Sequence, residues 1–202
     1  MKGETNSKVR ERTHRPPGAW SMTLETHGMA GQVSMPGQFV HVKCGHSRLL
    51  RRPISVCTCY SDEPSDLLTI VFEVRGEGTD WLARRPVGHS LDVLGLAGNG
   101  FTMKPEGHYL LVGGGIGIPP MLGCAQYTQG KSTAILGGRS ADKTILQNCF
   151  QDECAKVLTA TDDGSLGHHG LVAALVRQEL QGDHNYGAVL ACGPRPTLRT
   201  VA

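Results

Sequence analysis

A run of glycines after an apolar segment is the stretch of this sequence best suited to bind a charged ligand. Residues 110–112 are Leu-Leu-Val, residues 113–117 are Gly-Gly-Gly-Ile-Gly, and the helix-favouring residues 121–125 follow. Glycine has no side chain, so backbone N–H groups there can approach a ligand closely. A helix start adds free N–H donors and a partial positive charge. The pattern predicts a phosphate or pyrophosphate site, although a glycine-rich turn alone is often only structural.

Two earlier stretches also carry groups suited to a phosphate-bearing ligand. Residues 51–55 are Arg-Arg-Pro-Ile-Ser, where a guanidinium could clamp a phosphate while the serine hydroxyl faces a flat heterocycle. Residues 75–79, Arg-Gly-Glu-Gly-Thr, form a second glycine turn before a short helix and are a second candidate anion site. The ordinary alternatives are a solvated arginine pair with a strand serine, and a plain turn with Thr79 as the helix N-cap.

Cys192 follows the last expected parallel strand and precedes Gly193 and Pro194. Ligands of open α/β sheets lie beyond the carboxyl ends of the strands, so Cys192 is expected at the same crevice as residues 113–117. The helix start after it could stabilise a thiolate, while the ordinary alternative is an inert buried thiol. Asp162 and Asp163 end another strand at this edge, and a solvated turn is the preferred interpretation over a ribose or interdomain role.

The elements that must position these residues change in type near residues 103–107. Before this point, short alternating segments separated by turn residues predict an antiparallel barrel or sandwich; these segments are 20–25, 37–44, 53–57, 67–74 and 91–95. After it, strands alternate with helices, which predicts a parallel sheet with helices on both faces. The expected strands are 108–113, 132–138, 155–161 and 187–191, and the expected helices are 119–129, 142–153 and 170–180. We expect domains at 18–104 and 105–202, after a frayed polar tail at 1–17.

Composition narrows the class of protein and its compartment. The chain has 202 residues, 39% of them hydrophobic, and a formal net charge of +2, which fits one or two globular domains. It shows no basic block with interleaved aromatics, so nucleic acid is not an expected partner. No apolar run reaches transmembrane length and the start is polar, so no membrane partner is expected. Seven cysteines, an odd number, favour free thiols in a reducing, cytoplasmic compartment.

Taken in order, the motifs resemble those of the ferredoxin–NADP reductase superfamily. They are Arg-Pro-Ile-Ser at 52–55, Gly-Glu-Gly-Thr at 76–79, Leu-Gly-x-x-Gly-Asn-Gly-Phe at 94–101, Gly-Gly-Gly-Ile-Gly at 113–117 and Cys-Gly-Pro at 192–194. Within this superfamily, four stretches are most similar to the electron-transfer subunits of class 1B dihydroorotate dehydrogenase. They are residues 51–55, residues 94–101, Pro-Gly-Gln-Phe-Val at 36–40 and Thr-Asp-Asp-Gly-Ser at 161–165. The resemblance runs from about Pro17 to the last residue.

This resemblance implies a ferredoxin reductase-like fold, with an FAD-binding β-barrel before an NAD-binding α/β domain. Ser55 would hydrogen-bond near the flavin N5 and Cys192 would border the nicotinamide, which makes them the candidate catalytic residues. The implied FAD contacts are Arg52, Pro53, Ile54, Ser55, Val71, Phe72, Glu73, Gly78 and Thr79. The implied dinucleotide contacts are Gly113, Gly114, Gly115, Gly117, Cys192, Gly193 and Pro194.

The resemblance also implies a function. Such a subunit binds FAD, oxidises NADH or reduces NAD+, and exchanges electrons with an FMN-containing dihydroorotate dehydrogenase catalytic subunit in pyrimidine biosynthesis. The family also has a cysteine-rich segment that binds a [2Fe–2S] cluster, with a spacing such as C-x₄-C-x₂-C. Cys149 and Cys154 have the first gap, but Val157 stands at the third position. We therefore expect no metal ligands within these residues.

Two other functions stay open at this point. One is a flavin-dependent NAD(P)H reductase module of another complex, such as a hydrogenase or a ferredoxin–NADP reductase. The other is a non-catalytic remnant that binds flavin and transfers nothing. The choice between NADH and NADPH is also open, because Arg139 and Lys143 could accept a 2′-phosphate.

Overall fold

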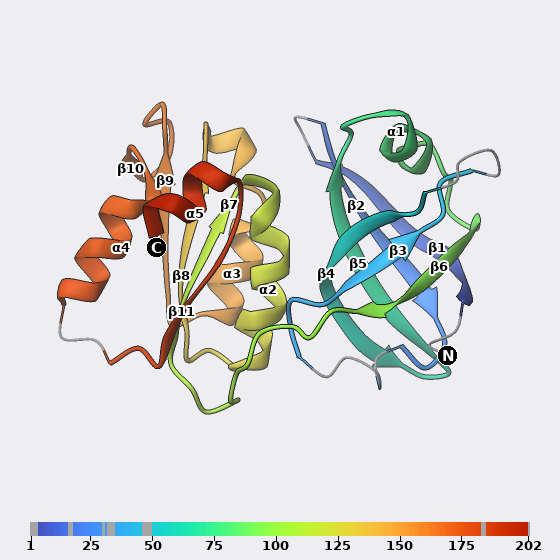
Figure 1. Ribbon diagram of the computed structural model, residues 1–202, viewed down its shortest axis with the longest axis horizontal. Helices are drawn as coiled ribbons and strands as arrows, with labels where there is room; N and C mark the ends of the chain where they lie inside the picture. Colours follow the sequence, from blue (N-terminus) through green and yellow to red (C-terminus); the bar gives the residue numbers. More distant parts are fainter. Residues whose placement is uncertain are drawn as a thin grey trace. The chain divides into compact units, whose positions relative to one another are not determined.

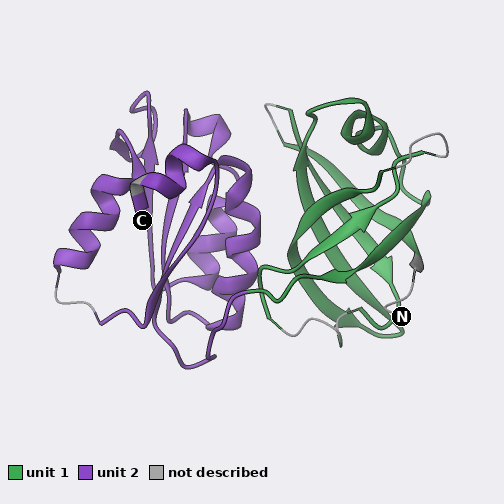
Figure 2. Ribbon diagram, in the orientation of Figure 1, with its two compact units in different colours: residues 1–100 green, residues 101–202 purple. Residues whose placement is uncertain are grey.

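The computed structural model describes residues 4–15, 18–29, 31, 35–45, 50–182 and 185–201, without the side chains of residues 4, 5 and 200. The chain divides between Gly100 and Phe101 into two compact units (Figure 2). The division falls a few residues before the expected boundary at 104. The first unit is an antiparallel barrel and the second is built on a parallel sheet, which confirms the fold class predicted from the alternation patterns.

Six strands close the barrel of the first unit, in the order β1-β2-β5-β4-β3-β6 (Figure 1). They are β1 (Glu4–Arg15), β2 (Ala19–Thr26), β3 (Phe39–Val42), β4 (Arg52–Asp62), β5 (Ser65–Glu73) and β6 (Ser90–Ala97). Alternate residues of each strand point inward, so Val40, Val42 and Ile54 belong to one buried core. Helix α1 (Glu77–Ala83) adds Leu82 to this core.

The expectation of a frayed tail at residues 1–17 is wrong for Glu4–Arg15, which forms β1. This strand pairs with β2 along one edge and with β6 along the other. Its inward positions include Ser7 and Val9, both fully buried, while charged residues alternate with them. A strand with one solvated face needs few apolar residues when its backbone is paired on both sides. The low apolar content of this stretch therefore misled the sequence interpretation.

The second unit contains five parallel strands in the order β10-β9-β8-β7-β11. They are β7 (Tyr109–Gly114), β8 (Thr133–Gly138), β9 (Lys156–Thr161), β10 (His168–His169) and β11 (Ala188–Cys192). The helices are α2 (Ile118–Tyr127), α3 (Gln147–Glu153), α4 (Val172–Gln181) and α5 (Arg195–Val201). Helices α2 and α3 cover one face of the sheet, and α4 and α5 cover the other (Figure 1).

Two details of this unit differ from the expected elements. The helix expected at 142–153 is a short 3-10 turn at Ala141–Lys143 followed by α3, because Leu146 adopts a left-handed conformation with φ of 65°. The two-residue strand β10 was not anticipated. No helix in the described part of the chain is long and apolar enough to cross a membrane.

Candidate functional site

The first candidate site lies on the barrel unit, where the start of β4 meets the first turn of α1. A Cβ atom built on Gly78 would lie 2.6 Å from Arg52 Nε and 3.1 Å from both Cζ and Nη2. The guanidinium therefore rests directly on the Gly78 backbone, and only glycine leaves room for it there. Two separately predicted phosphate ligands are thus brought together by the fold.

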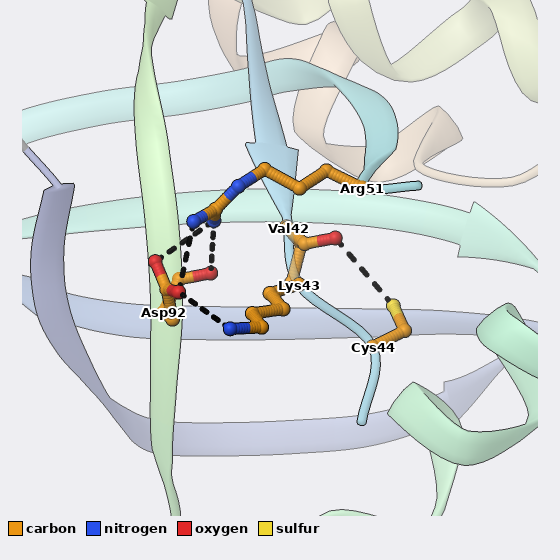
Figure 3. A network of polar contacts seen from close by, with 5 residues as sticks. All are labelled: Val42, Lys43, Cys44, Arg51 and Asp92. Atoms are coloured by element: carbon orange, nitrogen blue, oxygen red, sulfur yellow. Dashed lines mark hydrogen bonds and ion pairs between the residues drawn. The ribbon is translucent and has the colours of Figure 1, made fainter. Parts of the chain in front are cut away.

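The adjacent arginines at this strand start have different partners. Arg51 donates from Nη1 to Asp92 Oδ1 and from Nη2 to Oδ2, both at 2.8 Å, and Lys43 Nζ lies 3.8 Å from the same carboxylate (Figure 3). Arg52 donates from Nη1 to the Leu50 carbonyl oxygen at 3.0 Å. Within the described residues no carboxylate pairs with Arg52. Arg52 is therefore the arginine with hydrogen-bond donors left for an anion.

Thr79 organises the turn that carries Gly78. Its Oγ1 accepts hydrogen bonds from the backbone N–H groups of Arg75 at 2.9 Å and Gly76 at 3.3 Å, and donates to the Gly76 carbonyl at 3.1 Å. Gly76 is the N-cap of α1, so Thr79 lies at the third helical position and is not the N-cap. The hydroxyl is engaged by its own turn, which gives Thr79 a positioning role for the Gly78 backbone.

The outer face of the barrel next to Arg52 carries Ser55 and two aromatic rings. In the antiparallel register, Phe39 lies opposite Ser55 and His41 lies opposite Pro53. The ring centroids of Phe39 and His41 are 5.3 Å apart, and the two ring planes meet at 69°, so the rings pack edge to face. No hydrogen bond from the half-buried Ser55 hydroxyl reaches another described residue. Sequence reasoning missed both rings, although alternation within residues 37–44 would place them outside once Val40 and Val42 are inside.

Some expected FAD contacts have their side chains elsewhere. Ile54 and Phe72 are 7% and 4% exposed and belong to the barrel core, so their side chains are not presented on the face of Ser55. Val71 and Glu73 lie on the other face of β5 from Phe72. Glu73 accepts a hydrogen bond from Arg75 Nε at 2.7 Å. The structure presents Pro53 and Ser55 on the outer face of β4 and Arg52 at the start of the same strand, whereas the side chains of Ile54 and Phe72 lie in the core.

Arg15 is a second cation near this end of the barrel. It pairs with Ala19 across the β1–β2 ladder, and Ala19 pairs with Glu73, the last residue of β5. The loop from Glu73 leads to Gly78. Arg15 Nε is buried and has no hydrogen-bond partner in the described part of the chain. The sequence interpretation missed this residue because it fell within the expected tail.

The second candidate site lies on the other unit, at the carboxyl ends of β7 and β11. Cys192 pairs with Gly113 in the parallel ladder. A Cβ atom on Gly117 would overlap the Cys192 carbonyl and lie 2.6 Å from Gly193 Cα, and one on Gly114 would lie 2.9 Å from Thr197 in α5. The glycine turn and the Cys-Gly-Pro stretch therefore form one edge of the sheet, as expected from strand order. Thr197 was not anticipated.

The four glycines of the turn are required for different reasons. A Cβ atom on Gly113 would lie 2.8 Å from Ile118 Cα, so this glycine, like Gly114 and Gly117, allows close packing. Gly115 has φ of +54°, and a Cβ atom there would meet nothing within 4 Å. Gly115 is consequently the glycine that leaves an open backbone surface, which is the arrangement a phosphate group needs.

Burial favours the neutral form of the Cys192 thiol. Burial raises the pKa of Cys192 above its ordinary value of 9.0. Burial, and after it repulsion between the thiolate forms of Cys124 and Cys192, raises the pKa of Cys124 on α2 to about 12. This direction is opposite to the thiolate stabilisation expected from the following helix start, because desolvation disfavours the charged form.

The residues at the end of β9 form a turn. Asp163 Oδ1 accepts hydrogen bonds from Ser165 N at 2.9 Å and Ser165 Oγ at 2.6 Å, and these bonds lower the Asp163 pKa. Ser165 Oγ also accepts from Ala141 N at 2.8 Å, next to the exposed Arg139. This agrees with the turn interpretation of Asp163. Among the described residues no group of three or more His, Cys, Asp or Glu could hold a metal ion.

Curated relatives are similar over most of the chain, whereas no model of a protein family matches it. The dihydroorotate dehydrogenase B (NAD(+)) electron transfer subunit of Bacillus caldolyticus is 40% identical over 179 residues, covering 85% of this chain and 67% of the relative. The subunit of the same name from Geobacillus sp. (strain WCH70) is 33% identical, covering 100% of this chain and 78% of the relative.

Solved structures share the fold. An NADH-dependent reduced ferredoxin-NADP oxidoreductase has a TM-score of 0.81 at 24% identity, covering 98% of this chain and 71% of that chain. The cytochrome b5 reductase domain of Ulva prolifera nitrate reductase has a TM-score of 0.74 at 14% identity, covering 98% of this chain and 90% of that chain. At these identities the likeness concerns the fold alone.

Proposed function

Because this chain belongs to the family of the dihydroorotate dehydrogenase B electron transfer subunits, we propose that it transfers electrons between NAD(H) and a catalytic partner subunit through bound FAD. The structural observation that carries the proposal is the contact of Arg52 with Gly78. Membership of this family favours the dihydroorotate dehydrogenase complex over a hydrogenase or ferredoxin–NADP reductase complex.

The residues of the barrel unit fit FAD. Arg52 keeps donors for a pyrophosphate, and Gly78 lets the guanidinium lie against the first turn of α1, where the phosphates would bind. Two phosphates match this pair of elements better than the single phosphate of FMN. The face of Ser55, Pro53 and Phe39 would receive the flat ring, with Ile54 and Phe72 supporting it from inside the barrel.

The residues of the second unit fit the dinucleotide. Gly115 presents open backbone before α2, where a pyrophosphate would meet the glycine turn and the positive end of the helix dipole. Pro119 and Pro120 in the first turn of α2 have no N–H, so the hydrogen bonds would come from the glycine turn. Cys192 ends β11 at the same edge, Gly193 and Pro194 follow it, and the three residues would border the nicotinamide. We propose NADH as the substrate, because the relatives are named for NAD(+).

The protein's contribution is to bind and orient rather than to supply a strong acid or base. FAD, when bound, supplies a hydride acceptor at N5 that can release electrons singly. Ser55 would donate a hydrogen bond near that atom, and Arg52 would hold the phosphates. The neutral Cys192 thiol would border the nicotinamide without adding a charge.

An FMN-containing catalytic subunit and a cytoplasmic location are parts of the same proposal. The relatives' name, electron transfer subunit, supports a partner. The cysteines form no disulfide, which supports a reducing compartment. The described residues offer no ligand set for the family's [2Fe–2S] cluster, so we assign no step to one.

The visible spectrum of the purified chain before and after NADH, without oxygen, tests the proposal. We expect a flavin band that NADH bleaches and that orotate restores when the catalytic subunit is present. The cofactor released on heating should be FAD. A flavin that NADH leaves unchanged would indicate the non-catalytic remnant, and restoration by a hydrogenase subunit alone would indicate another complex.

A further inference from the structure

Both tryptophans of the chain carry a stacked arginine on the barrel unit. Arg12 Cζ lies 4.4 Å from the ring centroid of Trp20, and Arg85 Cζ lies 4.2 Å from that of Trp81. Trp20 is on β2 and Trp81 is on α1. We call these four residues the arginine–tryptophan surface. Tryptophan is the best ring for a cation–π contact, and arginine is the cation most often found over it.

The two stacks form a single surface. Arg12 Nη1 donates to the Arg85 carbonyl oxygen at 3.2 Å, and Arg85 Nε donates to the Trp81 carbonyl oxygen at 3.0 Å. Both tryptophans also pack against the barrel core. The two guanidinium groups are therefore held in place by ring stacking and backbone hydrogen bonds, so little freedom would be lost when they bind a partner.

The positive charges of this surface are not neutralised within the described residues. Neighbouring Arg84 pairs with Asp80 at 2.8 Å, and Arg10 Nη1 lies 3.8 Å from Glu25. Arg12 and Arg85, in contrast, have no carboxylate partner in the described part of the chain. Each keeps N–H donors for an acceptor outside this chain, and a guanidinium fork matches a carboxylate with two hydrogen bonds.

We propose that the arginine–tryptophan surface binds carboxylates on the catalytic partner subunit. The inference rests on the proposed function, which requires such a subunit. Tryptophan and arginine are the residue types that most often dominate binding energy in protein interfaces. The exposed Val87, in the loop after Arg85, adds apolar area at 60% exposure. Trp81 shares α1 with Gly78, but neither Arg12 nor Arg85 is among the residues proposed to hold FAD.

Labelling the chain with 5-fluorotryptophan tests the inference directly. The chain has only two tryptophans, so two fluorine NMR signals report on this surface while an unlabelled catalytic subunit is titrated in. We expect both signals to shift on binding. Arg12→Gln and Arg85→Gln should each weaken the complex about tenfold or more, which is the loss of one charge-assisted hydrogen bond.

Arg84→Gln is the matched control, because it removes the same charge from an arginine that already pairs with Asp80. It should leave the affinity within about twofold, the scale of an exposed ion pair. All three variants should keep NADH-dependent bleaching of their own flavin. Equal affinity of wild type, Arg12→Gln and Arg85→Gln would overturn the inference and leave the proposed function intact.

Two further outcomes separate the possible failures. If the wild-type chain forms no complex with the catalytic subunit, the proposed function fails and this interface fails with it. If the fluorine signals shift with phosphatidylserine vesicles but not with the catalytic subunit, the surface is a lipid site and the inference is overturned.

Discussion

The guanidinium of Arg52 covers the backbone of Gly78, so that a Cβ atom at position 78 would lie 2.6 Å from Nε. The contact joins the start of β4 to the first turn of α1. Arg52 donates one hydrogen bond to the Leu50 carbonyl and pairs with no carboxylate among the described residues. The arginine is thus held beside free backbone groups with its charge available to an anion.

Gly78→Ala should weaken FAD binding without unfolding the barrel. The added methyl group must displace Arg52, and a flexible side chain can move at little cost to folding. We expect the FAD dissociation constant to rise about tenfold, or about 1.4 kcal/mol, in a titration of the flavin-free protein. Gly76→Ala is the control, because a Cβ atom there meets nothing within 4 Å. Equal effects of the two changes would contradict the role of the contact.

Arg52→Gln and Arg51→Gln should separate ligand binding from stability. Loss of the Arg52 charge should raise the FAD dissociation constant by about tenfold to a hundredfold, as expected for charge-assisted hydrogen bonds. Arg51→Gln removes the bidentate pair with Asp92 and should lower the free energy of unfolding by about 1 kcal/mol with FAD affinity nearly unchanged. The reverse pattern would show that the two arginines have been assigned wrongly.

The sequence was sufficient to predict both folds, because alternation and strand–helix order depend on local pattern. The sequence-based prediction was wrong at β1, which was expected to be a frayed tail. There, backbone pairing on both edges of the strand compensates for its few apolar residues. Among the residues of β1 whose side chains the structure describes, only Ser7 and Val9 are fully buried. Such compensation depends on closure of the barrel and cannot be read from one segment.

The candidate sites show the same limit. Motifs predicted Arg52 and Gly78 as ligands, but their contact depends on how β4 and α1 meet. Phe39 and His41 were missed because their place beside Ser55 and Pro53 follows from strand register. Thr197 was missed for a similar reason, since α5 folds back over Gly114. Residues that act through neighbours distant in sequence need the structure to be found.

Ser55→Ala should slow flavin reduction while FAD stays bound. The change removes one neutral hydrogen bond of roughly 1 kcal/mol, so a rate about tenfold lower is expected in stopped-flow measurements with NADH. Ser61→Ala is the control on the same strand, because Ser61 donates to Asp66 at 3.0 Å and is not part of the site. An unchanged rate for Ser55→Ala would remove this hydroxyl from the mechanism.

Gly117→Ala should destabilise the second unit. Its methyl group would overlap backbone atoms of Cys192 and lie 2.6 Å from Gly193 Cα, and overpacking of this kind costs about 1–3 kcal/mol. Gly187→Ala is the control, because its nearest neighbour would lie 3.6 Å away.

Two probes localise this effect during urea unfolding. Helices α2 and α4 contribute helical circular dichroism from the second unit, while Trp20 and Trp81 report fluorescence from the first. Gly117→Ala should shift the helical transition to lower urea and leave the fluorescence transition in place. A shift of the fluorescence transition alone would contradict the packing role of Gly117.

Cys192 should react slowly with iodoacetamide and should be protected by NAD(H). Only the thiolate reacts, and burial raises the Cys192 pKa above 9.0. Its reactive fraction at neutral pH is therefore small and should rise about tenfold per pH unit until the pKa is reached. Saturating NAD(H) should slow the modification further if the nicotinamide lies beside this thiol.

Peptide mass spectrometry can follow Cys154 as the control. Burial raises the pKa of Cys154 to about 12, and Cys154 lies outside the proposed site. A rate that levels off near neutral pH would reveal a thiolate, and equal rates with and without NAD(H) would place the nicotinamide elsewhere.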